Sequence, residues 1–184
     1  MTSARLEQVL NEIDRINRTD PRGYELPYSE WLTGWVKQLE PHASEELLIA
    51  ARGQHVARWK VPRDQFPMDR KGYLGWREKL KGLHAGTVSW LMRQAGYPPE
   101  SIEKVERIIL KKNLRDPEAQ VVEDALCLVF LERQFTDLRL KEPEEKMLEI
   151  LRKSWRKMGE KGRAEALKLK FPSEEETLLK KALA

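Results

Sequence analysis

The stretch PYSEWLTGWVKQL, residues 27–39, repeats its apolar side chains at the spacing of an α-helix. The apolar members stand at i, i+3, i+4, i+7, i+8 and i+11, and they are Tyr28, Trp31, Leu32, Trp35, Val36 and Leu39. Side chains at these positions form one stripe along a helix, and such a stripe needs a partner surface to be buried against. Pro27 suits the first turn, and Pro41 ends the helix. The stretch therefore predicts an amphipathic helix inside a helical domain.

The same period recurs over nearly the whole chain. It predicts further helices over residues 3–17, 45–59, 71–95, 101–112, 117–135, 143–158 and 164–169. Ser44 followed by two acids is typical of a helix start, and Gly96 suits a helix end. Alternation with a period of two, which strands require, is absent from the sequence. We predict an all-α fold: one helical bundle over residues 1–184, with its core at 3–158 and a helical extension at 159–184.

Residues 60–70 separate two of the predicted helices. Pro62, Pro67 and several charged side chains in this segment fit no helical stripe. We therefore predict an ordered loop of about ten residues, a length that in compact domains is often associated with function.

Composition limits the classes of protein that the chain can belong to. The 34 basic and 30 acidic side chains give a net charge of +4, a near balance that is weak evidence for nucleic-acid binding. No apolar run approaches the ~20 residues needed to cross a membrane, and the first residues lack the apolar core of a signal peptide. A single cysteine, Cys127, excludes an intramolecular disulfide. These features predict a cytoplasmic protein.

Two histidines and an acidic pair lie on three different predicted helices. They are His55, His84 and the pair Glu123 and Asp124. Imidazoles and carboxylates from separate helices can converge inside a bundle, and a catalytic metal needs about three protein ligands and one open position. We predict a metal site formed by His55, His84 and Asp124, suited to zinc, iron or manganese. Glu123 points about 100° away from its neighbour on a helix and is our candidate catalytic base.

Several strings of the sequence resemble a known family. They include residues 51–59 (ARGQHVARW), 66–74 (FPMDRKGYL), 116–120 (DPEAQ), 127–132 (CLVFLE) and 151–158 (LRKSWRKM). Together they cover most of the chain and resemble the uncharacterised domain-of-unknown-function family 4202. The resemblance implies no particular activity.

A more distant resemblance is to the HD superfamily of metal-dependent phosphohydrolases, all-helical domains in which histidines and aspartates bind metal. Residues 47–56 (LLIAARGQHV) resemble the helix that ends in the His-Asp pair of that superfamily, so Gln54 takes the histidine position and His55 the aspartate position. Tyr28 stands roughly where the first histidine is expected, and Glu123 with Asp124 keeps the later acidic position. The resemblance implies an HD-like fold and hydrolysis of a phosphate ester.

Arginines accompany the predicted site along the sequence. Guanidinium groups bind phosphate and carboxylate through paired hydrogen bonds, so Arg52, Arg58 and Arg63 are our candidates for holding an anionic substrate. Ordinary ion pairs with neighbouring acids are the competing explanation. The leading hypothesis is a metal-dependent enzyme that acts on a phosphorylated or nucleotide-like small molecule.

Other interpretations of the same residues stay open. The chain can be a non-catalytic protein whose basic surface binds RNA or a protein partner, or an iron-dependent oxygenase that uses the same ligands. Each histidine can equally be a hydrogen-bonded core residue, and Asp124 can form an internal salt bridge with Arg52 or Arg58.

Overall fold

The computed structural model describes residues 3–113 and 115–183, and every regular element in them is helical. Residues 1–2, 114 and 184 of the predicted domain lie outside this description. The N-terminal helices are α1 (Ala4–Asn17), α2 (Glu25–Leu39), α3 (Glu45–Gly53), α4 (Arg70–Gln94) and α5 (Pro99–Ile109). The C-terminal helices are α6 (Pro117–Val129), α7 (Phe135–Arg139), α8 (Glu144–Lys157), α9 (Glu160–Ala166) and α10 (Ser173–Leu183). The predicted all-α fold is confirmed.

Local signals in the sequence fix several helix ends. The Ser44 hydroxyl accepts a hydrogen bond from the backbone N–H of Leu47 at 3.0 Å, and the Asp69 carboxylate accepts one from Gly72 at 2.7 Å. These bonds satisfy amide groups that the first turn of a helix leaves unpaired. Gly96 follows α4 with φ of 75°, a left-handed conformation that glycine adopts without strain. The helix start predicted at Ser44 and the helix end predicted at Gly96 are confirmed.

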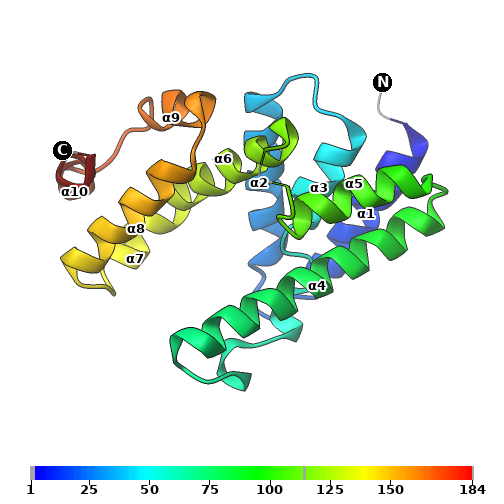
Figure 1. Cartoon of the computed structure of the whole chain (residues 1–184), viewed down its shortest axis with the longest axis horizontal. Helices are drawn as coiled ribbons and strands as arrows, with labels where there is room; N and C mark the ends of the chain where they lie inside the picture. Colours follow the sequence, from blue (N-terminus) through cyan, green and yellow to red (C-terminus); the bar gives the residue numbers. More distant parts are fainter. Residues whose placement is uncertain (1–2, 114, 184) are drawn as a thin grey trace.

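Helix α2 lies at the centre of the fold (Figure 1). It packs against α3 on one side and α6 on another, while α4 packs on α5 and α8 on α10. In Figure 1, α1, α3 and α5 lie to the right of α2, and α7 to α10 lie to its left. The central position of α2 agrees with the apolar stripe predicted for it.

The stripe of α2 forms part of the main hydrophobic core. Leu32 and Val36 are fully buried, and Tyr28 is 4% exposed. Burying such a side chain contributes about 1.5–3 kcal/mol relative to leaving it in water. One cluster of buried apolar side chains extends from Leu6 in α1 to Ala182 in α10. The predicted C-terminal extension therefore packs on the same core as the rest of the chain.

The helix predicted over residues 45–59 is too long. Helix α3 ends at Gly53, and Ala57 then takes a left-handed conformation with φ of 57° before a short 3₁₀ turn, η1 (Arg58–Lys60). A Cβ atom at Gly53 would lie 2.3 Å from a methyl carbon of Val88, so the glycine lets α3 cross α4 closely. The chain turns after that crossing. His55 therefore lies in a turn and not in the middle of a helix.

The helix predicted over residues 117–135 is interrupted. Helix α6 ends at Val129, a π-helical turn follows at Phe130–Gln134, and α7 continues from Phe135. Single π-helical turns are rare and occur often at functional sites. This turn supplies Phe130 and Gln134 to a pocket described below.

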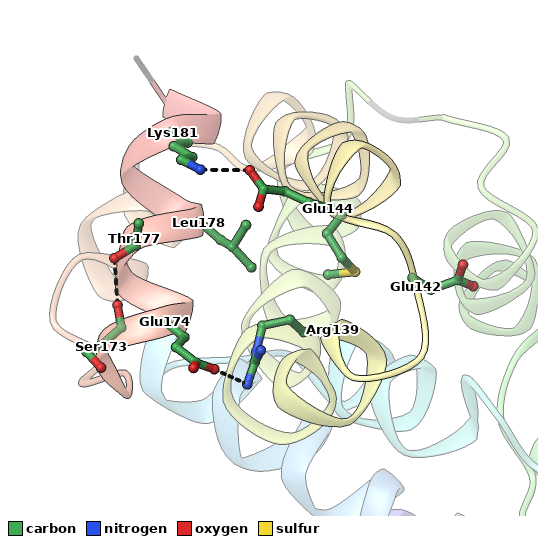
Figure 2. Close-up of a pocket in the computed structure, with 9 residues that line it drawn as sticks. Arg139, Glu142, Glu144, Ser173, Glu174, Thr177, Leu178 and Lys181 are labelled. Atoms are coloured by element: carbon green, nitrogen blue, oxygen red, sulfur yellow. Dashed lines mark hydrogen bonds and ion pairs between the residues drawn. The ribbon is translucent and has the colours of Figure 1, made fainter.

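The C-terminal helices differ most from the prediction. A helix was predicted over residues 164–169, within a helical extension at 159–184. The structure has α9 at Glu160–Ala166 and α10 at Ser173–Leu183, so α10 lies in the predicted extension but was not predicted as a separate helix. Ion pairs attach α10 to its neighbours (Figure 2): Arg139 lies 2.7 Å from Glu174, and Lys181 lies 2.7 Å from Glu144. Exposed pairs contribute only about 0–1 kcal/mol each, so the apolar side chain of Leu178, 8% exposed, contributes more to holding α10 in place.

Helix α4 is the longest described helix, with 25 residues. Its sequence mixes lysines, arginines and glycines with apolar residues, and Tyr73 and Leu74 near its start are exposed. Over residues 3–113 and 115–183, no helix is both long and apolar enough to span a membrane.

Candidate functional site

A pocket of about 440 Å³ lies where α2, α4, α6 and α8 meet. We call it the histidine pocket, because both predicted histidines line it. Its histidine and basic lining residues are His55, Arg58, Arg77, Lys81, His84, Lys111 and Lys157. The volume falls in the range of small-molecule binding sites.

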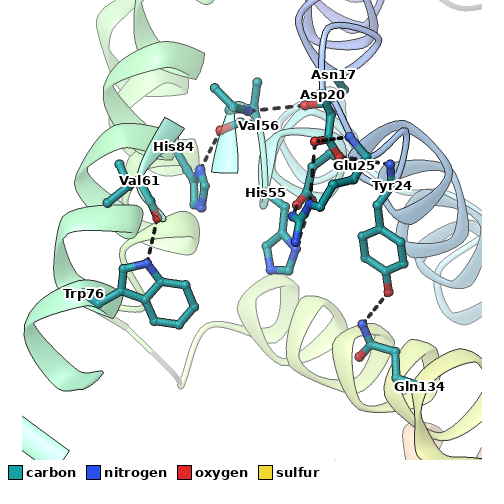
Figure 3. A network of polar contacts seen from close by, with 12 residues as sticks. Asn17, Asp20, Tyr24, Glu25, His55, Val56, Val61, Trp76, His84 and Gln134 are labelled. Atoms are coloured by element: carbon teal, nitrogen blue, oxygen red, sulfur yellow. Dashed lines mark hydrogen bonds and ion pairs between the residues drawn. The ribbon is translucent and has the colours of Figure 1, made fainter. Parts of the chain in front are cut away.

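His84 projects from α4 and is 2% exposed. Its Nδ1 lies 2.7 Å from the carbonyl oxygen of Val56, and because a carbonyl only accepts, Nδ1 carries the proton (Figure 3). The other ring nitrogen, Nε2, therefore has a free lone pair, and it finds no hydrogen-bond partner among the described residues. Burial lowers the pKa of His84 to about 4, against the weaker opposing effect of the Val56 hydrogen bond. The ring is thus a neutral hydrogen-bond acceptor at neutral pH.

His55 lies beside His84, with ring centroids 5.9 Å apart. Its ring stacks on Tyr28 at a centroid distance of 4.2 Å and an angle of 8°. Its Nδ1 atom faces a carboxylate oxygen of Glu25 at 3.7 Å, beyond hydrogen-bond distance, and finds no closer partner among the described residues. Burial, followed by the positive charge of Arg58, holds the pKa of His55 well below its usual value.

Glu25 is a site residue that the sequence analysis did not predict. It is the first residue of α2, is 1% exposed, and lies behind His55 as seen from the pocket (Figure 3). Burial raises its pKa to about 7, while Arg58 and Arg22 act in the opposite direction. An acid in the first turn of a helix is common, so the sequence holds no signal that sets this glutamate apart.

Asp124 does not join the two histidines. It points from α6 toward the start of α9, where its two oxygens accept hydrogen bonds from the backbone N–H groups of Gly159 at 2.7 Å and Gly162 at 3.2 Å. The side-chain amide of Gln120 donates a third bond at 2.8 Å. A Cβ atom at Gly162 would lie 2.6 Å from the Asp124 carboxyl carbon, so this carboxylate fills its site completely.

The predicted metal ligands therefore do not form one group. The two imidazoles are side by side and have the right chemistry, but the carboxylate oxygens of Asp124 are taken up by the start of α9. Within the described residues, no group of three or more histidine, cysteine, aspartate and glutamate side chains is arranged to hold a metal ion. This donor set does not fit the predicted centre.

Glu123, the predicted base, lies on the pocket side of α6, facing away from its neighbour Asp124. It forms an ion pair with Lys111, which adopts a left-handed backbone with φ of 56°. Burial lowers the pKa of Lys111, and Glu123 partly opposes that effect. The carboxylate of Glu123 is therefore engaged by a buried cation.

Of the three predicted substrate-binding arginines, only Arg58 lines the histidine pocket. Arg52 instead forms two hydrogen bonds with Asp14, at 2.6 and 2.7 Å. Arg63 donates to backbone carbonyls of its own loop, including that of Pro67 at 2.8 Å, and so holds the loop over residues 60–70 in place. Arg52 and Arg63 therefore have structural partners outside the pocket.

Three pocket cations lack an acidic partner. Arg58, Arg77 and Lys157 have no carboxylate oxygen within 4.0 Å among the described residues. The remaining two, Lys81 and Lys111, pair with Glu78 and Glu123. Arg77, Lys81 and His84 follow one another at i, i+4 and i+7 on α4, a spacing from which sequence analysis could have grouped them.

Cys127 also lines the pocket and is 7% exposed. Burial raises the pKa of its thiol to about 11. The thiol therefore stays protonated at neutral pH, which makes it a poor nucleophile.

The sequence model of a family described as "Domain of unknown function (DUF4202)" matches residues 7–179. The chain belongs to this family. In this DUF4202 chain, the strings that carry the resemblance supply much of the pocket: residues 51–59 contribute His55 and Arg58, and residues 151–158 contribute Lys157. No curated protein and no solved structure gives a significant match.

Proposed function

We propose that this protein binds a phosphorylated or nucleotide-like small molecule in the histidine pocket. The observation that carries the proposal is the convergence of Arg58, Arg77 and Lys157, none of which has an acidic partner among the described residues, on a pocket of about 440 Å³.

Electrostatics support an anionic ligand. Arg58 is partly shielded from water, and burial lowers its pKa from the usual value. Placing a cation in such surroundings is costly unless an anion compensates it. Guanidinium groups form paired, charge-assisted hydrogen bonds with phosphate, so a phosphate group between Arg58 and Arg77 would stabilise both.

Aromatic side chains support a ligand with a flat or extended body. The Trp76 indole N–H donates to the carbonyl of Val61 at 2.8 Å, which fixes the ring at the pocket wall (Figure 3). Arg58 lies 4.7 Å from the centre of that ring, and Tyr73 beside it is 42% exposed. A base or sugar ring can pack against these surfaces while the phosphate reaches the cations.

The sequence analysis led to the hypothesis that an enzyme with an HD-like fold hydrolyses such a ligand with the help of a metal. The turn at Gln54 and His55 after an apolar helix supports the scaffold part of that hypothesis. The positions of Asp124 and Glu123 do not support the metal part, and we route no step through a metal. Binding without turnover is the second candidate function, and the engagement of both acids by other groups favours it.

The test is titration calorimetry with AMP and ribose 5-phosphate on wild-type protein and charge-neutral variants. Arg77→Gln and Lys157→Gln should each weaken binding by about tenfold or more, because each removes a charge-assisted hydrogen bond. Arg93→Gln on α4 and Lys153→Gln on α8 remove the same charges outside the pocket and should leave binding unchanged.

The proposal fails if neither phosphate binds at millimolar concentration, or if the matched surface variants weaken binding as much as the pocket variants. Binding of a short RNA without binding of either small molecule would support the RNA-binding alternative instead.

A further inference from the structure

We infer that the ligand of the histidine pocket is a hydroxylated phosphate ester, a sugar phosphate or nucleotide, whose hydroxyl groups donate to His55 and His84. The inference rests on the proposed function. It adds which groups the ligand carries besides its phosphate. It follows from how the two imidazoles are held, and it assigns a positioning role to Glu25.

The first acceptor is Nε2 of His84. The Val56 carbonyl holds the proton on Nδ1, and the rigid imidazole then directs the Nε2 lone pair away from that carbonyl. The side chain is 2% exposed, lines the pocket, and gives Nε2 no hydrogen-bond partner among the described residues. A buried acceptor left unpaired destabilises the structure, so a ligand that donates to it gains affinity.

The second acceptor is Nε2 of His55. Its Nδ1 faces the buried carboxylate of Glu25 at 3.7 Å, and Tyr28 stacks on the ring and limits its rotation. At 3.7 Å the two groups form no hydrogen bond, but the negative charge of an ionised Glu25 favours a proton on Nδ1 over one on Nε2, which points to the other side of the ring. The carboxylate thus selects the Nδ1–H form, in which the Nε2 lone pair faces away from Glu25.

Burial raises the pKa of Glu25 to about 7, against the effects of Arg58 and Arg22, so its carboxylate is mostly ionised at pH 8. Arg22 lies 3.4 Å from one of its oxygens, and Arg58 acts on it from the pocket side. Asp20, whose carboxylate accepts the backbone N–H of Glu25 at 3.1 Å, acts against ionisation. Burial, Arg58 and His84 hold the pKa of His55 well below its usual value, with Lys111 and Arg77 acting in the same direction, so the imidazole is neutral.

The two acceptors and the cations line one pocket and suit two different groups of one ligand. The imidazole centres lie 5.9 Å apart and offer no protons to the pocket, so they favour O–H or N–H donors and disfavour a second phosphate. The unpaired cations on α4 and α8 favour the phosphate. A chain of carbon atoms with hydroxyl groups at one end and a phosphate at the other satisfies both requirements.

A matched pair of probes tests the inference: ribose 5-phosphate and n-pentyl phosphate, which share the phosphate and five carbons but differ in hydroxyl groups. At pH 8, wild-type protein should bind ribose 5-phosphate about tenfold or more tightly than pentyl phosphate, because the alkyl chain leaves both acceptors unpaired. Glu25→Met should reduce that preference, whereas Arg77→Gln should weaken both probes by the same factor.

Equal affinity for the two probes would overturn the inference and leave phosphate binding intact. Absence of binding by both probes would overturn the proposed function together with the ligand class.

A nitrogen-15 NMR spectrum of the histidine rings tests the arrangement without any ligand. His55 and His84 should both show the Nδ1–H form at pH 8, with the exposed His42 as an internal reference. Glu25→Met should change His55 alone. An Nε2–H form of His55 in wild-type protein would contradict the role of Glu25, whatever the binding results.

Discussion

In the part of the chain that the structure describes, buried polar groups are hydrogen-bonded at the junction of α6 with α9, whereas several of those in the histidine pocket are not. At the junction, both oxygens of Asp124 accept hydrogen bonds, and two backbone N–H groups and the Gln120 amide donate them. In the pocket, Nδ1 of His55, Nε2 of His84 and one oxygen of Glu25 find no partner among the described residues. A satisfied buried group stabilises the fold, whereas unsatisfied ones cost free energy unless a further partner, such as the ligand that we propose, completes them.

The largest expected effect concerns the junction. Asp124→Ala should lower the free energy of unfolding by about 3–4 kcal/mol, because it leaves two backbone amide groups without acceptors and removes one of the two acceptors of the Gln120 amide. Urea unfolding measures this loss, and Asp124→Asn, which keeps one acceptor, should lose about half as much.

The Asp124→Ala variant also tests whether Asp124 stabilises the fold without taking part in ligand binding. Asp124→Ala protein that is still folded at low temperature should bind ribose 5-phosphate as the wild type does. Loss of binding with unchanged stability would place Asp124 in the site after all.

The next effect concerns Glu25 and pH. Its pKa is raised from 4.5 to about 7 by burial, so the folded protein holds this proton more tightly than the unfolded chain does. The stability that Glu25 contributes is therefore fully present below pH 4.5 and is lost as pH rises through about 7. Relative to Glu25→Gln, which does not titrate, the wild type should lose on the order of 2–3 kcal/mol between pH 5 and pH 8.

Urea unfolding of both proteins at several pH values checks this difference. His84, with a pKa lowered to about 4, makes stability rise with pH between about 4 and 6.5, but it does so in both proteins and cancels in the comparison. A difference between the two proteins that does not vary with pH would show that Glu25 is not a buried, poorly solvated acid.

Asp124 and Glu25 also show which features of the fold and of the site could be predicted from the sequence. The helices were predictable because their signals are local: the stripe of α2, the Ser44 cap and Gly96 each lie within a few residues of the feature they specify. The end of α3 was not predictable, because the close approach of Val88 that requires a glycine at position 53 comes from far along the chain. The placement of Glu25 likewise depends on a contact with His55 that no short spacing encodes.

The carboxylate of Asp124 was misjudged for a different reason. We expected a buried aspartate to need a metal, a histidine or an arginine as partner, and the backbone amides of α9 were not considered. Helix starts carry unpaired N–H groups that bind a carboxylate well. The sequence analysis placed the start of this helix at residue 164, whereas α9 begins at Glu160. The backbone amides that bind Asp124 were therefore not predicted to lie at a helix start.

Two arginines extend the comparison to cations. Arg52→Met should destabilise the protein by about 2–3 kcal/mol, because it leaves the largely buried carboxylate of Asp14 without its cationic partner. Arg58→Met should change stability by less than about 1 kcal/mol, because no described carboxylate oxygen lies within 4.0 Å of it and it acts on Glu25 only at longer range. The same change should weaken ribose 5-phosphate binding by about tenfold. Thermal unfolding and calorimetry on the two variants check both values. A large loss of stability in Arg58→Met would show that the pocket is a structural element and not an empty binding site.

The smallest expected effect is that of a chelator. If cations of the chain hold the phosphate, dialysis against EDTA leaves the Kd for ribose 5-phosphate unchanged, as calorimetry would show. The contrary result would be about one metal per chain by elemental analysis, lost in both His55→Ala and His84→Ala. Asp124 would still be unable to serve as the third ligand, because its oxygens are engaged by α9. The carboxylate nearest to the imidazoles, Glu25, would then take that position, and the unsatisfied atoms of the pocket would be explained by a cation instead of by hydroxyl groups.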